Sequence, residues 1–357
     1  MSDWVLHFDL DQFIAAVEVG RRPELRGLPV VVGGNGDPTQ RAVVATASYE
    51  AREFGVHSGM PLRTALKRCP DAVFLPADHA AYEEASARVM TVLREFPTKG
   101  KQHSVEVIGW DEAFIGAAVD DPEALALELR QAVLDECALD SSVGIGDNKL
   151  RAKLATGFAK PAGIFRLTKD NWVEVMADRP TRALWGIGSR TSAKLAEAGI
   201  ATVRDLAAAD PADLAKRFGP NMGPYFRSLA LGAGSTEVTA TPYVPRSRSR
   251  ETTFQENLVS RIDIDEQVVL LARRVSEDVR AEGRACARVA VKVRFAPFFT
   301  QTRSMTLPSP TTDPADIERA ALAVVDRFEL SRPVRLLGVR AEFVTDVEPD
   351  PSSSTYR

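Results

Sequence analysis

The chain has 357 residues, of which 45% are hydrophobic and 26% are charged. This length fits two to three domains, and the composition excludes a wholly disordered, collagen-like or disulfide-stabilised chain. No apolar run reaches the roughly 18 residues of a membrane span, and the N-terminus lacks the pattern of a secretory signal. The three cysteines form no Cys-x-x-Cys pair. We therefore expect a cytoplasmic protein with reduced thiols and no membrane contact.

The net charge of −4 argues against a nucleic-acid partner, but binding depends on local patches of charge. Residues 141–169 hold six basic side chains and one acid, and residues 246–303 hold twelve Lys or Arg against eight Asp or Glu. The acids gather elsewhere, notably in residues 111–140. This asymmetry suits an acidic metal centre beside basic surfaces that face phosphates.

The first half of the chain alternates strand and helix patterns, which predicts a mixed α+β sheet domain. In chain order the expected elements are a strand at 4–11, a helix at 12–18, strands at 28–33 and 42–47, a helix at 78–96, a hairpin at 104–118, a helix at 122–137 and a strand at 141–145.

The second half divides into a helical part and a second α+β module. Short helices with glycine and proline between them are expected over 171–231, and the small, polar stretch 232–245 has the composition of a linker. The module has expected strands at 250–254, 287–295, 300–307 and 334–344 and helices at 264–282 and 313–327. The polar tail after residue 345 is expected to be disordered.

Two pairs of carboxylates stand beside apolar strands. Asp9 and Asp11 are two residues apart on a predicted strand, so their side chains point to one face. Asp111 and Glu112 interrupt an apolar hairpin, where carboxylates are costly unless a cation neutralises them. Converging carboxylate oxygens suit Mg²⁺, and two such ions suit phosphoryl transfer. The spacing alone leaves open that one pair lies in an exposed turn and the other caps a helix.

Several ordered motifs decide how these carboxylates are interpreted. They are residues 8–18 (FDLDQFIAAVE), 44–52 (VATASYEAR), 55–61 (GVHSGMP), 110–113 (WDEA), 142–149 (SVGIGDNK), 152–155 (AKLA) and 159–161 (AKP). Together they resemble the motifs of Y-family DNA polymerases, most closely the DinB or polymerase-IV-like branch. Two departures stand out: Gly109-Trp110 precedes the Asp-Glu pair, and Ile14 occupies a position usually held by Tyr or Phe.

The resemblance implies an α+β, multidomain, right-hand polymerase. A palm would comprise residues 1–20 and 78–168, with small fingers at 21–77. A helical thumb with a helix-hairpin-helix would span 169–232. After a linker at 233–245, an α+β little finger would span 246–345, followed by the tail 346–357.

The resemblance also assigns the chemistry. Asp9, Asp111 and Glu112 would be catalytic and bind two Mg²⁺ ions, with the main-chain carbonyl of Leu10 as a further ligand and Mn²⁺ able to substitute. Asp11 belongs to the motif without a clear metal role. A primer 3′-hydroxyl would attack the α-phosphate of a dNTP and release pyrophosphate.

The nucleotide site is implied by the same motifs. Thr46, Tyr49, Arg52 and Lys160 would bind the β- and γ-phosphates, and Lys149 and Lys153 would lie nearby. Gln12, Phe13 and Ile14 would lie under the sugar, with Ile14 as the steric gate against the ribose 2′-hydroxyl. Because isoleucine is shorter than an aromatic ring, we expect ribonucleotides to be accepted. Small residues over the nascent base pair, Val44 and Gly59 among them, would lower fidelity.

Two segments are candidates for holding the DNA. Gly186 and Gly188 resemble the hairpin of a helix-hairpin-helix, whose backbone N–H groups bind a phosphate. Arg246, Arg248 and Arg250 alternate, so in a strand they share one face and could follow the phosphates. They are equally typical of an edge strand protected by charge.

The prediction is therefore a low-fidelity, template-directed DNA polymerase for translesion synthesis and repair. Its partners would be primer-template DNA, dNTPs and ribonucleotides, with the chain acting as a monomer. A nucleotidyl cyclase and a catalytically inactive DNA-binding protein are the alternatives. The tail contains no clamp-binding peptide of the Gln-x-x-Leu-Phe type, so we expect little stimulation by a sliding clamp.

Overall fold

The computed structural model describes residues 2–97 and 103–344, and the chain divides into two compact units. Unit 1 comprises Met1–Gly36, Val44–Met60 and Ala65–Pro242. Unit 2 comprises Asp37–Val43, Pro61–Thr64 and Tyr243–Arg357. The expected tail at 346–357 lies outside the described residues. No helix in the described part of the chain is long and apolar enough to cross a membrane.

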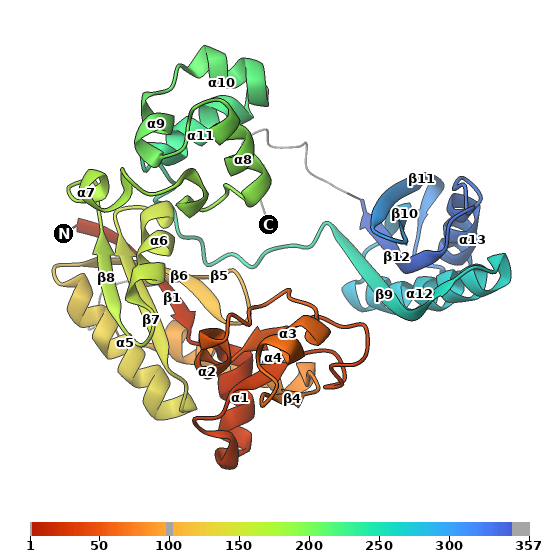
Figure 1. The fold of residues 1–357 in the computed structure, drawn as a ribbon, viewed down its shortest axis with the longest axis horizontal. Coiled ribbons are helices and arrows are strands. Elements are labelled where there is room, and N and C mark those ends of the chain that lie inside the picture. Colours follow the sequence, from red (N-terminus) through yellow and green to blue (C-terminus); the bar gives the residue numbers. More distant parts are fainter. Residues whose placement is uncertain (1, 98–102, 345–357) are drawn as a thin grey trace. The chain divides into compact units, whose positions relative to one another are not determined.

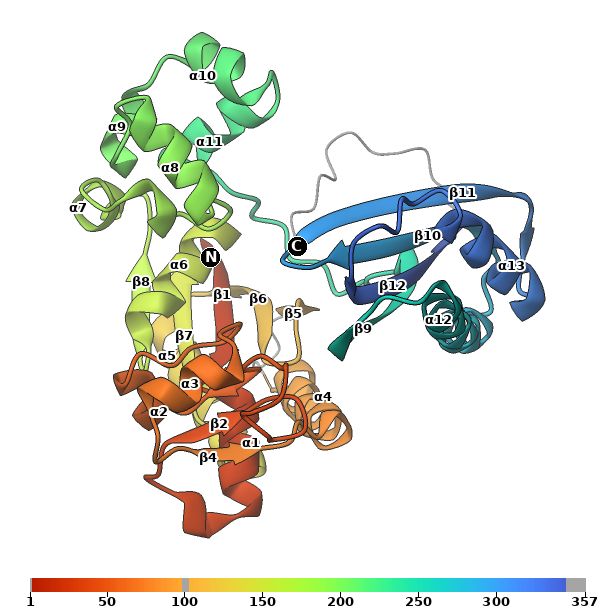
Figure 2. The same ribbon diagram turned by 45° about the vertical axis from the view of Figure 1, so that its right-hand side comes forward.

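Unit 1 is built on a five-stranded sheet in the order β5-β6-β1-β7-β8 (Figures 1 and 2). The strands are β1 (Ser2–Leu10), β5 (His103–Val107), β6 (Glu112–Val119), β7 (Ser141–Gly146) and β8 (Ile164–Leu167). Among the described strands of this sheet, only β7 and β8 pair in parallel. The N-terminal strand β1 is therefore central, between β6 and β7.

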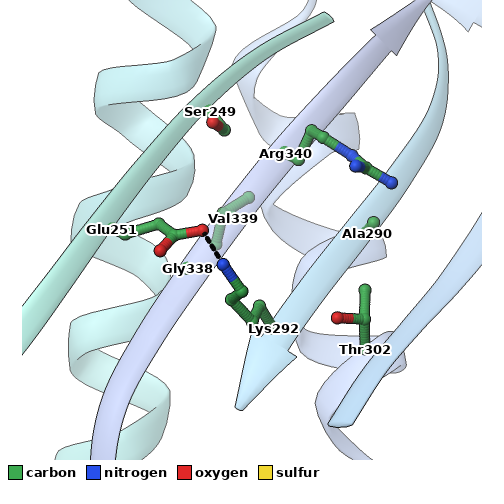
Figure 3. A pocket seen from close by; sticks show the side chains of 8 residues that line it. All are labelled: Ser249, Glu251, Ala290, Lys292, Thr302, Gly338, Val339 and Arg340. Carbon is green, nitrogen blue, oxygen red and sulfur yellow. Dashed lines mark hydrogen bonds and ion pairs between the residues drawn. The ribbon is translucent and has the colours of Figure 1, made fainter. Parts of the chain in front are cut away.

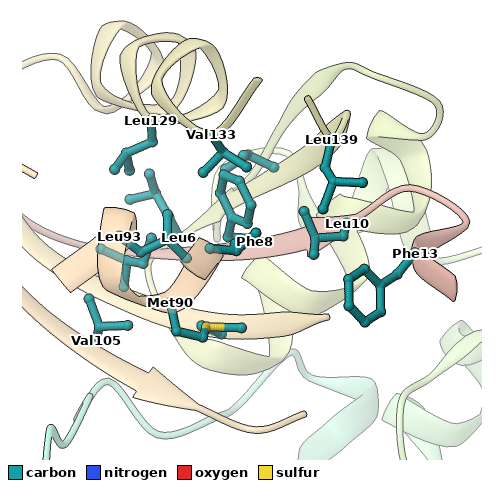
Figure 4. Packing of buried hydrophobic residues seen from close by; sticks show 14 of the residues in the cluster. Leu6, Phe8, Leu10, Phe13, Met90, Leu93, Val105, Leu129, Val133 and Leu139 are labelled. Atoms are coloured by element: carbon teal, nitrogen blue, oxygen red, sulfur yellow. The ribbon is translucent and has the colours of Figure 1, made fainter. Parts of the chain in front are cut away.

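Successive side chains of β1 point to opposite faces of the sheet. Leu6, Phe8 and Leu10 enter the main hydrophobic core, which α4 (His79–Glu95) and α5 (Pro122–Cys137) close (Figure 4). The alternate residues of β1 point to the opposite face, where α6 (Lys149–Ala159) packs. Asp9 belongs to this second face.

A small sheet in the order β3-β2-β4 stands beside the large one. It consists of β2 (Val30–Val32), β3 (Thr46–Ala47) and β4 (Val73–Leu75), with α1 (Phe13–Arg21), η1 (Pro23–Leu25), α2 (Tyr49–Glu53) and α3 (Leu62–Arg68) around it. The strand expected at 42–47 is only two residues long. The backbone of Val44 instead exchanges hydrogen bonds with Gly59 and Met60, which ends the ladder.

The helical part of unit 1 has a core of its own, which includes Trp172, Leu195 and Phe226. Its helices are α7 (Trp172–Met176), η2 (Thr181–Ala183), α8 (Ser189–Glu197), α9 (Val203–Ala208), α10 (Pro211–Phe218) and α11 (Met222–Ala230). The segment that follows is bound to the large sheet domain: Ser235 O accepts from Lys149 N (2.8 Å), and Thr239 N donates to Glu106 Oε2 (2.9 Å).

Unit 2 contains a four-stranded antiparallel sheet in the order β11-β10-β12-β9. Its elements are β9 (Ser247–Leu258), α12 (Arg261–Glu282), β10 (Cys286–Phe295), β11 (Phe299–Thr311), α13 (Pro314–Val325) and β12 (Val334–Phe343). Both helices pack on one face, against Val289, Val291 and Val293. The other face is formed by the alternate residues and carries no helix from the described residues of this unit (Figure 2).

Candidate active site

Two of the predicted carboxylates face each other across neighbouring strands. Asp9 of β1 is the direct register partner of Glu112 of β6. One atom from each of these carboxylates and one from the His7 imidazole lie within 4.8 Å of one another. The Asp111 side chain is not part of this cluster, although the Asp111 carbonyl accepts from Leu10 N at 2.8 Å. The sheet thus brings together ligands that lie more than 100 residues apart in the sequence.

Lysine side chains of α6 and of its C-terminal cap neutralise these carboxylates. The ammonium of Lys153 contacts Glu112 and lies 3.1 Å from Nε2 of His7. The ammonium of Lys160 contacts Asp9 and lies 3.8 Å from Asp11 Oδ1. Any cation that binds these oxygens therefore competes with two lysines.

Burial sets the electrostatics of the cluster. It raises the pKa values of Asp9 and Asp111, and the neighbouring charge of Glu112 raises that of Asp111 further. Burial opposes ionisation of Glu112 too, but hydrogen bonds from His7 and Lys153 outweigh it and lower the pKa of Glu112 to about 2. Burial also lowers the pKa of His7. The ionised form is thus favoured for Glu112 and disfavoured for Asp9 and Asp111. A bound cation would favour the ionised form of all three carboxylates.

Asp11 lies apart from this cluster. Strand β1 ends at Leu10, and Asp11 follows it with only 3% of its surface exposed. Its carboxylate accepts hydrogen bonds from Ser142 Oγ (3.0 Å to each oxygen), Tyr49 Oη (2.8 Å) and Ala162 N (2.7 Å). As predicted, it turns to the same side as Asp9, since Lys160 reaches both.

The predicted phosphate-binding residues Tyr49 and Arg52 stand on the short helix α2. Ser48 caps this helix by accepting from Ala51 N. Arg52 Nε donates to the carbonyl of Ala47 (2.9 Å), and its guanidinium lies 4.9 Å from the centre of the Tyr49 ring. The two side chains are therefore held together before any ligand binds. Thr46 lies on the adjacent β3, half-buried.

Gln12 precedes α1, and Phe13 and Ile14 begin it; the three side chains differ in what they offer a ligand. The Gln12 side chain accepts from Tyr49 N (2.6 Å), and its backbone is left-handed (φ 44°). Phe13 is 3% exposed and enters the main core (Figure 4), so its ring is not available to a ligand. Ile14 is half-buried in the first turn of α1, packed against the same core.

The predicted helix-hairpin-helix lies close to the large sheet. Gly186 has a φ of +96°, which a residue with a Cβ rarely adopts, and Gly188 is the N-cap of α8. The neighbouring Trp185 is 43% exposed; its ring centre lies 6.3 Å from that of Phe114 and 5.6 Å from Lys153 Nζ. Sequence reasoning missed Trp185, although an aromatic residue within a glycine hairpin is a usable signal.

In unit 2, the alternating arginines lie on the face that carries the helices. In the β9–β12 register Arg248 is opposite Ala341 and Arg250 is opposite Val339, both buried. Arg248 forms an ion pair with Glu282, and Arg250 one with Asp278 at 2.6 Å, both acids belonging to α12. Arg246 precedes β9 and its carbonyl accepts from Phe343 N. The one-face prediction is thus correct for Arg248 and Arg250, whose cations are already engaged by acids, whereas Arg246 lies outside the strand.

The opposite face of this sheet is polar and shallowly hollowed (Figure 3). Lys292 and Arg340 project there, and Lys292 pairs with Glu251 at 2.7 Å. The hollow has a volume of about 100 Å³ and is lined by Ser249, Glu251, Ala290, Lys292, Thr302, Gly338, Val339 and Arg340. Sequence reasoning did not single out Lys292 or Arg340, because isolated cations in a strand carry no distinctive pattern.

Family models match most of the chain. Residues 8–157 match the impB/mucB/samB family, residues 245–354 match the C-terminal domain of that family, and residues 184–223 match a SAM-like helix-hairpin-helix tandem.

Named relatives extend the match over nearly the full length. The chain is 52% identical to "DNA polymerase IV 2" of Mycobacterium tuberculosis (strain H37Rv), covering 95% of this chain and 97% of that one. The chain belongs to the Y family of DNA polymerases, in its polymerase-IV-like branch. It is also 40% identical to "DNA polymerase IV" of Methanoculleus marisnigri, over 94% of this chain and 93% of the relative.

Solved structures of Y-family polymerases have the same fold. A chimera of Dbh and Dpo4 matches with a TM-score of 0.81 at 25% identity, over 95% of this chain and 98% of the chimera. DinB from Sulfolobus solfataricus matches with a TM-score of 0.62, also at 25% identity, over 96% and 99% of the two chains. The predicted α+β fold with palm, fingers, thumb and little finger is confirmed.

The activity follows at the level of the family. The chain is a DNA-directed DNA polymerase of the translesion type, whose substrates are primer-template DNA and dNTPs. The nucleotidyl-cyclase alternative is wrong, because the relatives that match along the whole chain are polymerases. Y-family polymerases use divalent metal ions, and the cluster of His7, Asp9 and Glu112 is a group of residues that could hold one.

Proposed function

We propose that unit 1 joins a dNTP to a primer 3′-hydroxyl at the carboxylates Asp9, Asp111 and Glu112, with Leu10 O as a main-chain ligand. The observation that carries this proposal is the direct pairing of Asp9 with Glu112 beside two lysines. The donors are hard oxygens, which fit Mg²⁺ and also Mn²⁺. Two bound ions would lower the pKa of the attacking hydroxyl and neutralise the triphosphate.

The surrounding cations have defined tasks in this proposal. Lys160 leaves Asp9 to bind the triphosphate together with Thr46, Tyr49 and Arg52. Arg52 supplies a planar fork of donors, and Lys160 supplies a point charge. The contacts of Arg52 with Ala47 O and with the Tyr49 ring keep the fork oriented, so little side-chain entropy is lost on binding.

The test is extension of a labelled primer on a template, without metal and with Mg²⁺ or Mn²⁺. We expect extension only with a divalent ion. Metal-independent extension, or none with either ion, would contradict the proposal; the second result would favour the catalytically inactive alternative. The proposed palm (1–20 and 78–168) and fingers (21–77) contain all the residues that this test addresses.

Ile14 is proposed as a permissive steric gate. Its side chain stands half-buried in the first turn of α1, directly after the loop that carries Asp11 and Gln12. An aromatic ring at this position would fill the space beside the sugar C2′, whereas isoleucine is shorter and branches near the backbone. Exclusion of the ribose 2′-hydroxyl depends on such a clash. We therefore propose that the enzyme incorporates ribonucleotides as well as dNTPs.

Single-nucleotide insertion of a matched rNTP and dNTP tests the gate. We expect Ile14→Phe to lower the rNTP rate at least 10-fold while the dNTP rate stays within about threefold. Ile14→Leu is the control, because it keeps the volume of the side chain. Equal discrimination by the wild type and Ile14→Phe would show that Ile14 is not the gate.

DNA is proposed to be held by the thumb (169–232) and the little finger (246–345), joined by the linker 233–245. The backbone at Gly186 and Gly188 would bind a phosphate at the start of α8. Arg246, Arg248 and Arg250 were the expected little-finger contacts, but Arg248 and Arg250 lie on the face that α12 and α13 cover. Lys292 and Arg340 also pair with acids, Glu251 and Glu342, but they lie on the opposite face, which we propose as the DNA contact. We propose that the chain works as a monomer with little dependence on a sliding clamp.

A further inference from the structure

Asp11 gathers donors from three separate segments of unit 1. Its Oδ1 accepts from the Tyr49 hydroxyl of α2 (2.8 Å), and its Oδ2 accepts from Ala162 N in the turn after α6 (2.7 Å). Ser142 Oγ of β7 lies 3.0 Å from both oxygens. The carboxylate is 3% exposed, so water replaces none of these donors easily.

Two of the three donors lie on or beside a residue of the proposed triphosphate site. Tyr49 is itself such a residue, and Ala162 lies two positions after Lys160. Ala162 has a φ of 50°, a left-handed backbone that is unfavourable for alanine and that the hydrogen bond to Asp11 helps to hold. Gln12 adds a second tie, because its side chain accepts from Tyr49 N. Residues 11 and 12 therefore connect α2 to the turn of residues 160–162, which we call the Lys160 turn.

The same contacts argue against Asp11 as a metal ligand. Each oxygen of the Asp11 carboxylate already accepts from two donors, one of which is Ser142 Oγ in both cases. A cation that bound Asp11 would have to displace these donors. The Asp11 side chain is also less accessible than those of the proposed ligands, with 3% of its surface exposed against 16% for Asp9 and 25% for Glu112. Burial and the hydrogen bond to Asp11 raise the pKa of Tyr49, which keeps its hydroxyl protonated as a donor.

We propose that Asp11 is a positioning residue, which fixes Tyr49 and the Lys160 turn at the separation that a nucleoside triphosphate requires. This inference rests on the proposed function of Tyr49 and Lys160. Loss of Asp11 should then weaken nucleotide binding while the metal-dependent step proceeds, because the carboxylates of Asp9, Asp111 and Glu112 are unchanged.

The variant Asp11→Asn tests this with minimal change of shape. The asparagine oxygen can still accept from Tyr49 and Ser142, but its NH₂ group then meets the N–H of Ala162, and two donors repel. We expect the KM for dNTP to rise about 10-fold or more, with kcat within about threefold. The Mg²⁺ concentration for half-maximal rate should stay unchanged.

Ser142→Ala is the milder second variant, because Ser142 Oγ donates to Asp11 and is fully buried. We expect it to raise the KM for dNTP about three- to fivefold. Binding of dNTP to enzyme on a dideoxy-terminated primer, followed by fluorescence, should weaken in parallel for both variants.

Several outcomes would overturn the proposal. A kcat reduced by orders of magnitude at unchanged KM, or a shifted Mg²⁺ midpoint, would make Asp11 a metal ligand. An unchanged KM in both variants would leave Asp11 with a purely structural role; if Asp11→Asn does not fold, Ser142→Ala alone decides. Failure of the proposed function itself looks different, since the wild type would then show no metal-dependent extension.

Discussion

The close approach of α6 to β7 gives a prediction whose size can be estimated. A Cβ atom placed on Gly144 would lie 2.0 Å from the carbonyl oxygen of Ala152 and 2.3 Å from the backbone nitrogen of Thr156. Both contacts are with backbone of α6, so no side chain can rotate away. Gly144→Ala therefore requires α6 to withdraw by roughly 1.4 Å to reach an ordinary 3.4 Å contact. Only Asp147 and Asn148 join β7 to α6, so this short connection restricts how far the helix can move.

The expected cost is large for one methyl group. Overpacking of a tight core costs typically 1–3 kcal/mol, and a clash with backbone lies at about the upper end. Moving α6 also breaks the 2.8 Å hydrogen bond between Thr156 and His7, which lowers the free energy of unfolding by about 1 kcal/mol more. A total of about 4 kcal/mol is a large part of the 5–15 kcal/mol of a typical domain. A loss of 1 kcal/mol lowers the Tm of a domain of this size by about 2–4 °C, so Tm should fall by about 8–16 °C.

Tryptophan fluorescence isolates the relevant unit. The four tryptophans, Trp4, Trp110, Trp172 and Trp185, all belong to unit 1, so urea unfolding followed by their emission does not report unit 2. Gly157→Ala is the matched control on α6, because it is exposed and a Cβ there meets nothing within 4 Å. Gly157→Ala should raise the free energy of unfolding by about 0.5–1 kcal/mol, because alanine is favoured over glycine inside a helix. A Gly144→Ala variant within about 1 kcal/mol of wild type would refute the reasoning.

Three further predictions concern function. Asp111→Ala should lower primer extension at least 100-fold while DNA binding, measured by anisotropy, is retained; near-normal extension would mean that the metal site is elsewhere. Lys292→Ala should weaken DNA binding and reduce its salt dependence by about one ion, whereas Arg248→Ala should change the affinity less than about threefold; the reverse order would restore the arginine face as the interface. Primer extension should rise less than about twofold when a sliding clamp is added, and strong stimulation would contradict the proposed independence.

The sequence was sufficient where local pattern and motif agree. The two-residue spacing predicted that Asp9 and Asp11 point to one side, and the ammonium of Lys160 lies near both carboxylates. The family resemblance predicted the fold and the enzyme class. The helices and strands of unit 2 were also predicted, and the predicted ends differ from the observed ends by no more than four residues.

Contacts that depend on the placement of one element on another could not be predicted. The pairing of Lys153 with Glu112 exists because Gly144 and Gly146 allow α6 to lie against β7, and no local pattern encodes this distance. Similarly, the alternation of Arg248 and Arg250 shows that they share a face, but it does not show which face. That choice is made by the register with β12, since β9 has few apolar side chains to set it.

The central position of β1 has a consequence for synthesis of the protein. This strand is made well before its partners β6 and β7, which begin at Glu112 and Ser141. Until then a nascent chain carries an apolar strand with both edges unpaired, which is a template for aggregation. Asp9 therefore meets Glu112 only after about a third of the chain has been made, and Lys160 later still. The active centre can assemble only once Lys160 has been made, so the site depends on protection of β1 until then.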